Sequence, residues 1–311
     1  MQNILDNFED YINNLYNTKI LSKEYAGQYL FMSLIFLIDK SKDIKEVDKA
    51  LHLLITHPKC REYDKIMWKS DPLSFDHAHL TYHANLAWAI ANYKLKGGDI
   101  KYDDLFNKCC NILYKELKVS ENILTFPGKP IFIIDNLTAI LALHLHDKIF
   151  NRTDYQLLIA NYLNNIKTDS KGIIISMLST SQYKVRKNIR GSQFAYAIFI
   201  LSKIDKYLAY KYYLILKKYF IKHIDYLLFS VYGIKEFEKD PKSKFYTNFG
   251  DAGIVIKNIS GVGTLFGLGC AKIFNDFEWY KKFYKTVNLG LKLPSPIDMT
   301  FPKIILEDLK F

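Results

Sequence analysis

Three histidines lie within seven residues in the stretch "SFDHAHLTYHANLAW" (74–88), and they are the first candidates for chemistry. His79 and His83 are four residues apart and Asp76 precedes His79 by three, so a helix would align these side chains on one face, as in many zinc sites. His77 would face away from them. The chain has no His-Glu-x-x-His pattern, and we expect no metal and no other cofactor. A neutral His79 or His83 that transfers protons or binds substrate is the favoured interpretation.

Two further candidates are a tyrosine and a carboxylate near the starts of apolar segments. Tyr82 could polarise a hydroxyl or an oxyanion with its phenol, although with 23 tyrosines in the chain a packing role is the alternative. Asp135 begins such a segment, where a carboxylate either caps free backbone N–H groups or transfers protons. Asn136 would then hold a substrate hydroxyl beside it.

A third group of candidates lies in the C-terminal half of the chain. Arg190 precedes a Gly-Ser pair at a predicted helix start, where it could bind a carboxylate or phosphate, or lie on the surface. Glu236 and Asp251 lie in the segment "GIKEFEKDPKSKFYTNFGDAGIV" (233–255), which we predict to be a long irregular loop. With Asp135, these carboxylates could form the pair that glycosidases use. Sugar rings could then stack on aromatic residues, namely Phe75, Trp88, Phe132, Tyr246 and Phe249.

The elements that must position these residues follow a repeated pattern. Four segments are apolar nearly all round and close with Lys and then Asp or Asn, which predicts buried helices; they are 83–99, 135–151, 191–205 and 260–276. Each is followed by a segment with apolar residues at i, i+3, i+4 and i+7, which predicts a covering helix; these are 102–117, 155–166, 207–224 and 277–291. This alternation, at intervals of roughly 50 to 70 residues, indicates a helical-hairpin array.

The array predicts an all-α fold in one domain over residues 1–311. The first hundred residues allow one or two more hairpins, and roughly five or six hairpins close naturally into an (α/α) toroid. In such a ring the inner helices run the same way, so one end collects their N-termini. Partial positive charge there favours anionic or polarised groups, which makes the residues at these helix starts the best candidates for a site.

Composition and charge narrow the class of protein. Hydrophobic residues make up 49% and charged residues 24%, with only 8 prolines and 14 glycines, which is typical of a folded, helix-rich chain. The net charge of +11 comes from basic runs that lie far apart, so we expect no nucleic-acid partner. The four cysteines show no CxxC spacing and the N-terminus is acidic. The longest apolar run, 29–38, is too short to span a bilayer, so we expect a cytoplasmic protein without a membrane partner.

Several blocks resemble the linalool dehydratase-isomerase family over residues 70–290. They are "LTYHANLAWAIANYKLKGGDIKYDDLF" (80–106), "FPGKPIFIIDNLTAILALHLHDKIF" (126–150), "RGSQFAYAIFILSKIDKYLAYKYY" (190–213) and "GDAGIVIKNISGVGTLFGLGCAKIFND" (250–276). The resemblance implies an (α/α) toroid, a cofactor-free acid/base site at its centre and a ring-shaped homo-oligomer. That family uses a tyrosine and two cysteines to add water to an allylic alcohol or remove it. The tyrosine falls on Tyr82, one cysteine on Asp135, and the other near Phe126, where this chain has no thiol.

Together these observations predict a cofactor-free lyase, isomerase or hydratase that acts on a small hydroxylated substrate. The catalytic candidates are Tyr82, Asp135 and Asp251, and the substrate-binding candidates are His79, His83, Asn136, Arg190 and Glu236. One alternative is a carbohydrate-active hydrolase or lyase on the same toroid. The other is a binding or scaffold protein that has lost the reactive residues.

Overall fold

The computed structural model describes residues 5–17, 23–185, 189–226, 229–239, 245–249 and 253–292. They fall into two compact units. Unit 1 takes in the described residues up to Asn165 together with 179–184, and unit 2 takes in 166–178 and the described residues from Val185 to 292. Each unit is mostly helical, which confirms the prediction that helices dominate the fold.

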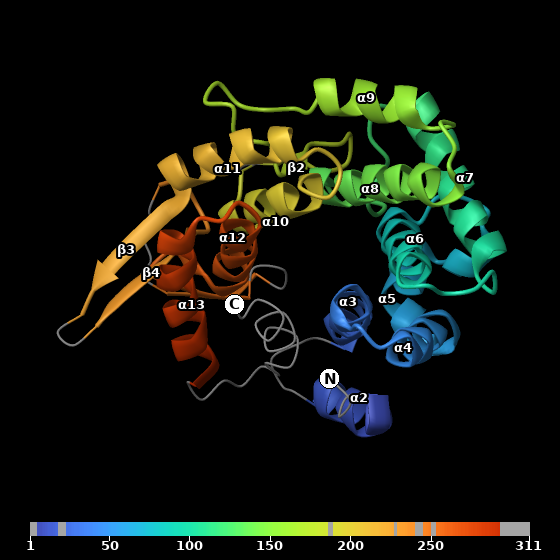
Figure 1. The fold of residues 1–311 in the computed structure, drawn as a ribbon, viewed down its shortest axis with the longest axis horizontal. Coiled ribbons are helices and arrows are strands. Elements are labelled where there is room, and N and C mark those ends of the chain that lie inside the picture. The colour runs from blue at the N-terminus through green and yellow to red at the C-terminus, as the bar shows by residue number, and fades with distance from the viewer. Residues whose placement is uncertain are drawn as a thin grey trace. The chain divides into compact units, whose positions relative to one another are not determined.

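Unit 1 is built from helices, with one short strand (Figure 1). The helices are α2 (Phe8–Asn17), α3 (Lys23–Lys40), α4 (Ile44–Thr56), α5 (Pro58–Trp68), the 3-10 turn η1 (Pro72–Ser74), α6 (Leu80–Leu95), α7 (Asp103–Val119), α8 (Ile133–Phe150) and α9 (Gln156–Asn164), and the strand is β1 (Ile131–Phe132).

The buried helices of unit 1 are α6 and α8, as their all-round apolar sequences predict. Every residue of α6 from Leu80 to Tyr93 is buried, and α8 is buried along most of its length. Thr81 in the first turn of α6 donates a hydrogen bond to Asp135 in the first turn of α8, so both helices start at the same end of the pair. The amphipathic helices α7 and α9 pack against them, confirming the alternation of buried and covering helices.

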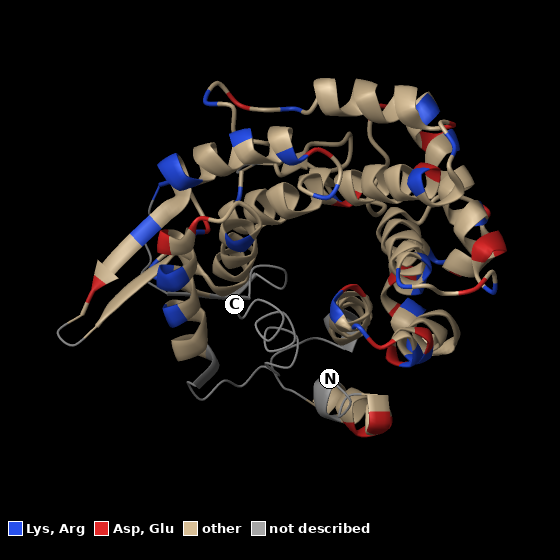
Figure 2. Ribbon diagram, viewed as in Figure 1, with Lys and Arg blue, Asp and Glu red and all other residues tan. Residues whose placement is uncertain are grey.

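Unit 2 repeats this arrangement and adds strands. Its helices are α10 (Gly191–Leu201), α11 (Lys206–Phe220), α12 (Gly261–Ile273) and α13 (Phe277–Lys292), and its strands are β2 (Met177–Leu178), β3 (Ile221–Asp225), β4 (Ser230–Lys235), β5 (Phe245–Phe249), β6 (Gly253–Ile256) and β7 (Ile259–Ser260). The buried helices α10 and α12 lie side by side, with the rings of Tyr196 and Phe266 stacked at 4.4 Å. Lysines lie along the covering helices α11 and α13, whereas α10 has none (Figure 2).

The strands correct two predictions. The segment 233–255 is not one irregular loop, because β4 to β7 belong to a five-stranded sheet in the order β3-β4-β7-β6-β5, with antiparallel neighbours. The covering helix predicted over 207–224 ends at Phe220, and the chain continues as β3 with Ile221 opposite Ile234. Pairing with β4 determines the conformation here, and such non-local partners leave little trace in the local periodicity.

Among the described helices, none is both long enough and apolar enough to cross a lipid bilayer.

Candidate functional site

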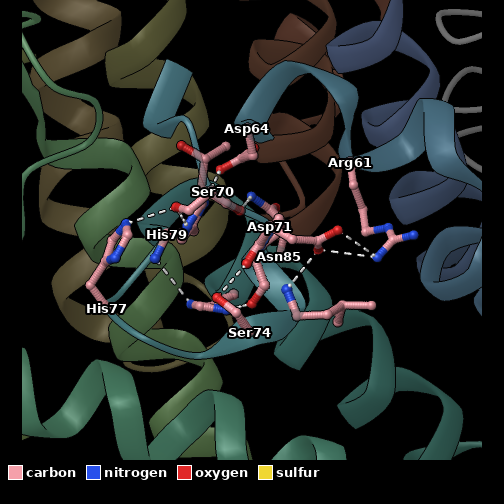
Figure 3. A network of polar contacts seen from close by, with 12 residues as sticks. Arg61, Asp64, Ser70, Asp71, Ser74, His77, His79 and Asn85 are labelled. Carbon is pink, nitrogen blue, oxygen red and sulfur yellow. Dashed lines mark hydrogen bonds and ion pairs between the residues drawn. The ribbon is translucent and has the colours of Figure 1, made fainter. Parts of the chain in front are cut away.

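A network of polar side chains lies where α5 ends and α6 begins (Figure 3). Lys69 ends α5 in the left-handed conformation (φ 58°), and the chain then turns back through η1 before α6 starts at Leu80. This turn brings residues of the α5–α6 connection against a buried carboxylate of α5. We call Asp64, Ser70, His77 and His79 the α5–α6 polar cluster.

His79 lies between an acid and a hydroxyl. Its Nε2 forms a 3.0 Å hydrogen bond with Oγ of Ser70, and its Nδ1 lies 3.7 Å from Oδ1 of Asp64, which is longer than a hydrogen bond. Asp64 and His79 are both buried, whereas Ser70 is half-buried. Burial raises the pKa of Asp64, while the contact with His79 works in the opposite direction.

His77 meets the same hydroxyl, contrary to the prediction that it faces away from His79. Its Nε2 lies 3.4 Å from Oγ of Ser70, and its ring stacks on that of His79 at 4.6 Å. Burial, followed by the neighbouring His79, lowers the pKa of His77, so its ring is neutral at pH 7. The helical spacing did not apply, because His79 is the residue before α6 and 76–79 are not helical. The ring of Trp68 covers both imidazoles, at 4.8 Å from His77 and 5.3 Å from His79.

His83 is held by the backbone on both ring nitrogens. Its Nδ1 accepts the backbone N–H of His79 at 3.1 Å, so its Nε2 carries the proton and donates to the carbonyl of Pro72 at 2.8 Å. Burial lowers its pKa from 6.5 to about 4. Phe75 stacks flat on the ring at 4.8 Å. Both ring nitrogens of His83 therefore bond the backbone, and neither is free for the substrate-binding role that we predicted from the sequence.

Asp71 fixes the same connection from the other side. It accepts the backbone N–H of Leu73 at 3.0 Å, and Nη1 of Arg61 reaches both of its oxygens at 3.1 and 3.2 Å. Burial alone would raise the pKa of Asp71, but these bonds and the cations Arg61 and Lys65 outweigh it and hold that pKa below the usual value. Asp71 therefore stays ionised and anchors the turn to α5.

Tyr82 points into the core of unit 1. It is fully buried, its ring stacks on Phe31 at 5.3 Å, and its hydroxyl has no hydrogen-bond partner among the described residues. Burial, with the thiol of Cys109 nearby, raises its pKa well above 10, so the phenol keeps its proton at every physiological pH.

Asp135 and Asn136 differ in burial and in hydrogen-bond partners. Asp135 is half-buried at the third position of α8, where it accepts the hydroxyl of Thr81 at 3.3 Å. It is not the N-cap, which is Phe132. Asn136 is fully buried and bonds the N–H and carbonyl of Ile123 and the carbonyl of Phe132, at 2.8 to 3.1 Å. Its amide therefore closes the loop before α8, and its contacts do not support the predicted role of holding a substrate hydroxyl.

Arg190 and Glu236 bond each other in unit 2. Nε of Arg190 lies 2.5 Å from Oε1 of Glu236, and both side chains are buried, so Arg190 is neither a surface residue nor an exposed anion clamp. The backbone N–H of Gly191 also donates to the carbonyl of Glu236 at 2.8 Å. A Cβ on Gly191 would lie 1.9 Å from the carbonyl oxygen of Lys235, which explains the glycine. Asp251 lies outside the described residues.

The proposed sugar platform finds little support in these contacts. Trp88 is completely buried and meets Phe36 edge to face at 5.8 Å, and Phe75 is stacked on His83. Phe132 is half-buried, and the side chains of Tyr246 and Phe249 lie outside the described part of the chain. Trp88 therefore cannot receive a sugar ring, and one face of Phe75 is taken by His83.

The structure therefore brings together residues that the sequence did not connect. Of the predicted residues only His79 belongs to the α5–α6 polar cluster, and Asp64 and Ser70 were missed. Ser70 follows Asp64 by six residues and precedes His79 by nine. These separations match no helical or strand period, because a helix end and a turn lie between the residues. Within the described residues, no three His, Cys, Asp or Glu side chains are arranged to hold a metal ion.

The chain matches no protein-family model and no curated protein.

Proposed function

We propose that this chain is a cofactor-free enzyme of the lyase, isomerase or hydratase class that moves protons on a small hydroxylated substrate, with His79 as its general base. The observation that carries the proposal is the position of His79 between the buried Asp64 and the half-buried hydroxyl of Ser70. A carboxylate facing Nδ1 favours the tautomer whose Nε2 lone pair points to the hydroxyl side. A substrate hydroxyl close to Ser70 would meet that lone pair.

Tyr82 and Asp135, to which the family resemblance assigns proton transfer, stay within this proposal. The phenol of Tyr82 is protonated and has no partner in the described part of unit 1, so it can act as a hydrogen-bond donor or acid. Asp135 lies at the start of α8 and accepts a hydrogen bond from Thr81, the residue that precedes Tyr82. Both belong to the two buried helices of unit 1.

The fold that we propose for this activity is an (α/α) toroid. Its support is the pairing of buried helices that start at the same end, α6 with α8 in unit 1 and α10 with α12 in unit 2, each followed by a covering helix. Assembly into a homo-oligomer is part of the same proposal. We also propose the cytoplasm as its compartment, because all four cysteines are buried free thiols, as in a reducing environment.

The test is turnover of a panel of small allylic and tertiary alcohols, followed by gas chromatography and by deuterium uptake from heavy water. We expect His79→Gln to lower the rate by at least about 100-fold, the usual scale of general acid–base catalysis. The exposed His52 on α4 provides a matched control, since His52→Gln makes the same substitution outside the α5–α6 polar cluster. Equal rates in His79→Gln and the unaltered protein would refute the proposal. Absence of turnover across the panel would refute it in favour of a binding or scaffold protein.

A further inference from the structure

We propose that Ser70 is a nucleophile and that Ser70, His79 and Asp64 form an acyl-transfer triad for small esters. The connectivity carries the inference: the hydroxyl of Ser70 bonds Nε2 of His79 at 3.0 Å, and the opposite nitrogen of the same ring faces the carboxylate of Asp64 at 3.7 Å. Serine hydrolases on unrelated folds share this order of atoms, in which the acid orients the imidazole and the imidazole takes the proton of the serine.

The burial of the three residues suits these tasks. Asp64 and His79 are 5% and 1% exposed, whereas Ser70 is half-buried at the end of α5. The acid and base are thus shielded from water, whereas the residue that carries the hydroxyl is partly exposed. Ser70 follows Lys69, whose left-handed conformation turns the chain sharply and separates Ser70 from the helix.

The surroundings add groups that such a reaction needs. His77 lies 3.4 Å from the same hydroxyl and can donate a hydrogen bond to an oxygen that becomes negative beside Ser70. The ring of Trp68 covers both imidazoles and gives the site an apolar wall. Asp71 and His83 hold the connection through backbone bonds, so Ser70 and His79 lie on a fixed turn beside Asp64 of α5.

The reaction balances with an ester and water as the only reactants. Oγ of Ser70 forms a bond to the carbonyl carbon, its proton passes to Nε2 of His79, and the carbonyl π electrons move to oxygen. When this adduct collapses, the bond to the leaving alkoxy oxygen breaks and that oxygen takes the proton from His79. Water then attacks the acyl-enzyme in the same way, which releases a carboxylic acid and restores Ser70.

The experiment is labelling of the full chain by phenylmethylsulfonyl fluoride, with the modified residue located by peptide mass spectrometry. We expect one equivalent on Ser70, none in Ser70→Ala, and a rate at least about 100-fold lower in His79→Gln. Ser74→Ala is the matched control: Ser74 lies in the same turn, is exposed, and bonds only the carbonyl of Asp71, so its loss should leave labelling unchanged.

A second readout uses p-nitrophenyl acetate, whose hydrolysis should begin with a burst of one equivalent of nitrophenol that Ser70→Ala abolishes. Asp64→Asn should slow both reactions at least about 10-fold, and this variant serves if His79→Gln does not fold. No label on Ser70, or equal labelling rates in the unaltered protein and the folded His79 or Asp64 variants, would overturn the triad. The proposal does not depend on the turnover of alcohols, so either activity can fail without the other.

Discussion

His83 provides the sharpest test of the structural reasoning, because a single imidazole joins three parts of the α5–α6 connection. Its Nδ1 accepts the N–H of His79 at 3.1 Å and its Nε2 donates to the carbonyl of Pro72 at 2.8 Å. The substitution His83→Leu keeps an apolar side chain of similar volume against Phe75 and removes both bonds. A backbone N–H and a backbone carbonyl then remain buried without these partners.

The expected loss at neutral pH follows from these two groups. A buried donor or acceptor left unsatisfied costs about 1–3 kcal/mol, so with two such groups the free energy of unfolding should fall by about 2–6 kcal/mol. In urea this loss would appear as a lower midpoint with an unchanged slope.

Acid should reduce the difference between the two proteins. Burial lowers the pKa of His83 from 6.5 to about 4, so between these values the unfolded chain binds a proton that the folded chain does not. The stability that neutral His83 contributes is complete above 6.5 and is lost as the pH falls towards 4, at about 1.4 kcal/mol per pH unit. Over the whole interval the loss is about 3 kcal/mol. The leucine variant lacks this titration.

Urea unfolding at a series of pH values across this interval measures the effect, and subtraction of the variant from the unaltered protein removes the titrations they share. The stability difference should shrink by about 3 kcal/mol on going from neutral pH to a pH near the lower pKa. A difference that stayed constant with pH would refute the neutral, backbone-bound His83.

Two other buried polar groups give predictions of the same kind. Arg190→Met or Glu236→Gln alone should each cost about 3–5 kcal/mol in urea unfolding, because each breaks a buried ion pair. The double variant should cost clearly less than the sum, and simple additivity would contradict the pairing. Asn136→Ala should lower the free energy of unfolding by about 2–4 kcal/mol, because it leaves the N–H and carbonyl of Ile123 without their side-chain partner. Asn165→Ala, at an exposed position, should change it by less than about 0.5 kcal/mol. Equal effects of the two substitutions would contradict the structural role of Asn136.

The buried helices could be predicted from the sequence because their segments are apolar on nearly all sides. The four all-round apolar segments became α6, α8, α10 and α12 with ends shifted by only a few residues, since a helix without a polar face must be buried wherever it lies. The sheet of unit 2 left no comparable trace. β4 pairs with β3 and β7, and Glu236 just after it bonds back to Asn258, contacts between residues that no periodic pattern links.

The candidate site was predictable only in part, for a related reason. His79 attracted attention through its neighbouring histidines, but its partners come from the end of α5 and the turn after it. Their meeting depends on the left-handed residue Lys69 and on the bonds of Asp71, neither of which is visible in residue spacing. Arg190 and Glu236 were both chosen as substrate-binding residues, and the fold brings them together as an ion pair instead.

The position of His79 and the stability of the turn therefore depend on one protonation state. His79 is the residue that precedes α6, and the side chain that accepts its N–H is His83, one turn into the helix. A protonated His83 has hydrogens on both nitrogens and cannot accept that N–H. Acid would thus release the backbone of His79 and, with it, the alignment of its ring between Asp64 and Ser70. Loss of activity near the pKa of His83 would then report a displaced base as well as a destabilised fold, so activity and the free energy of unfolding should decline together.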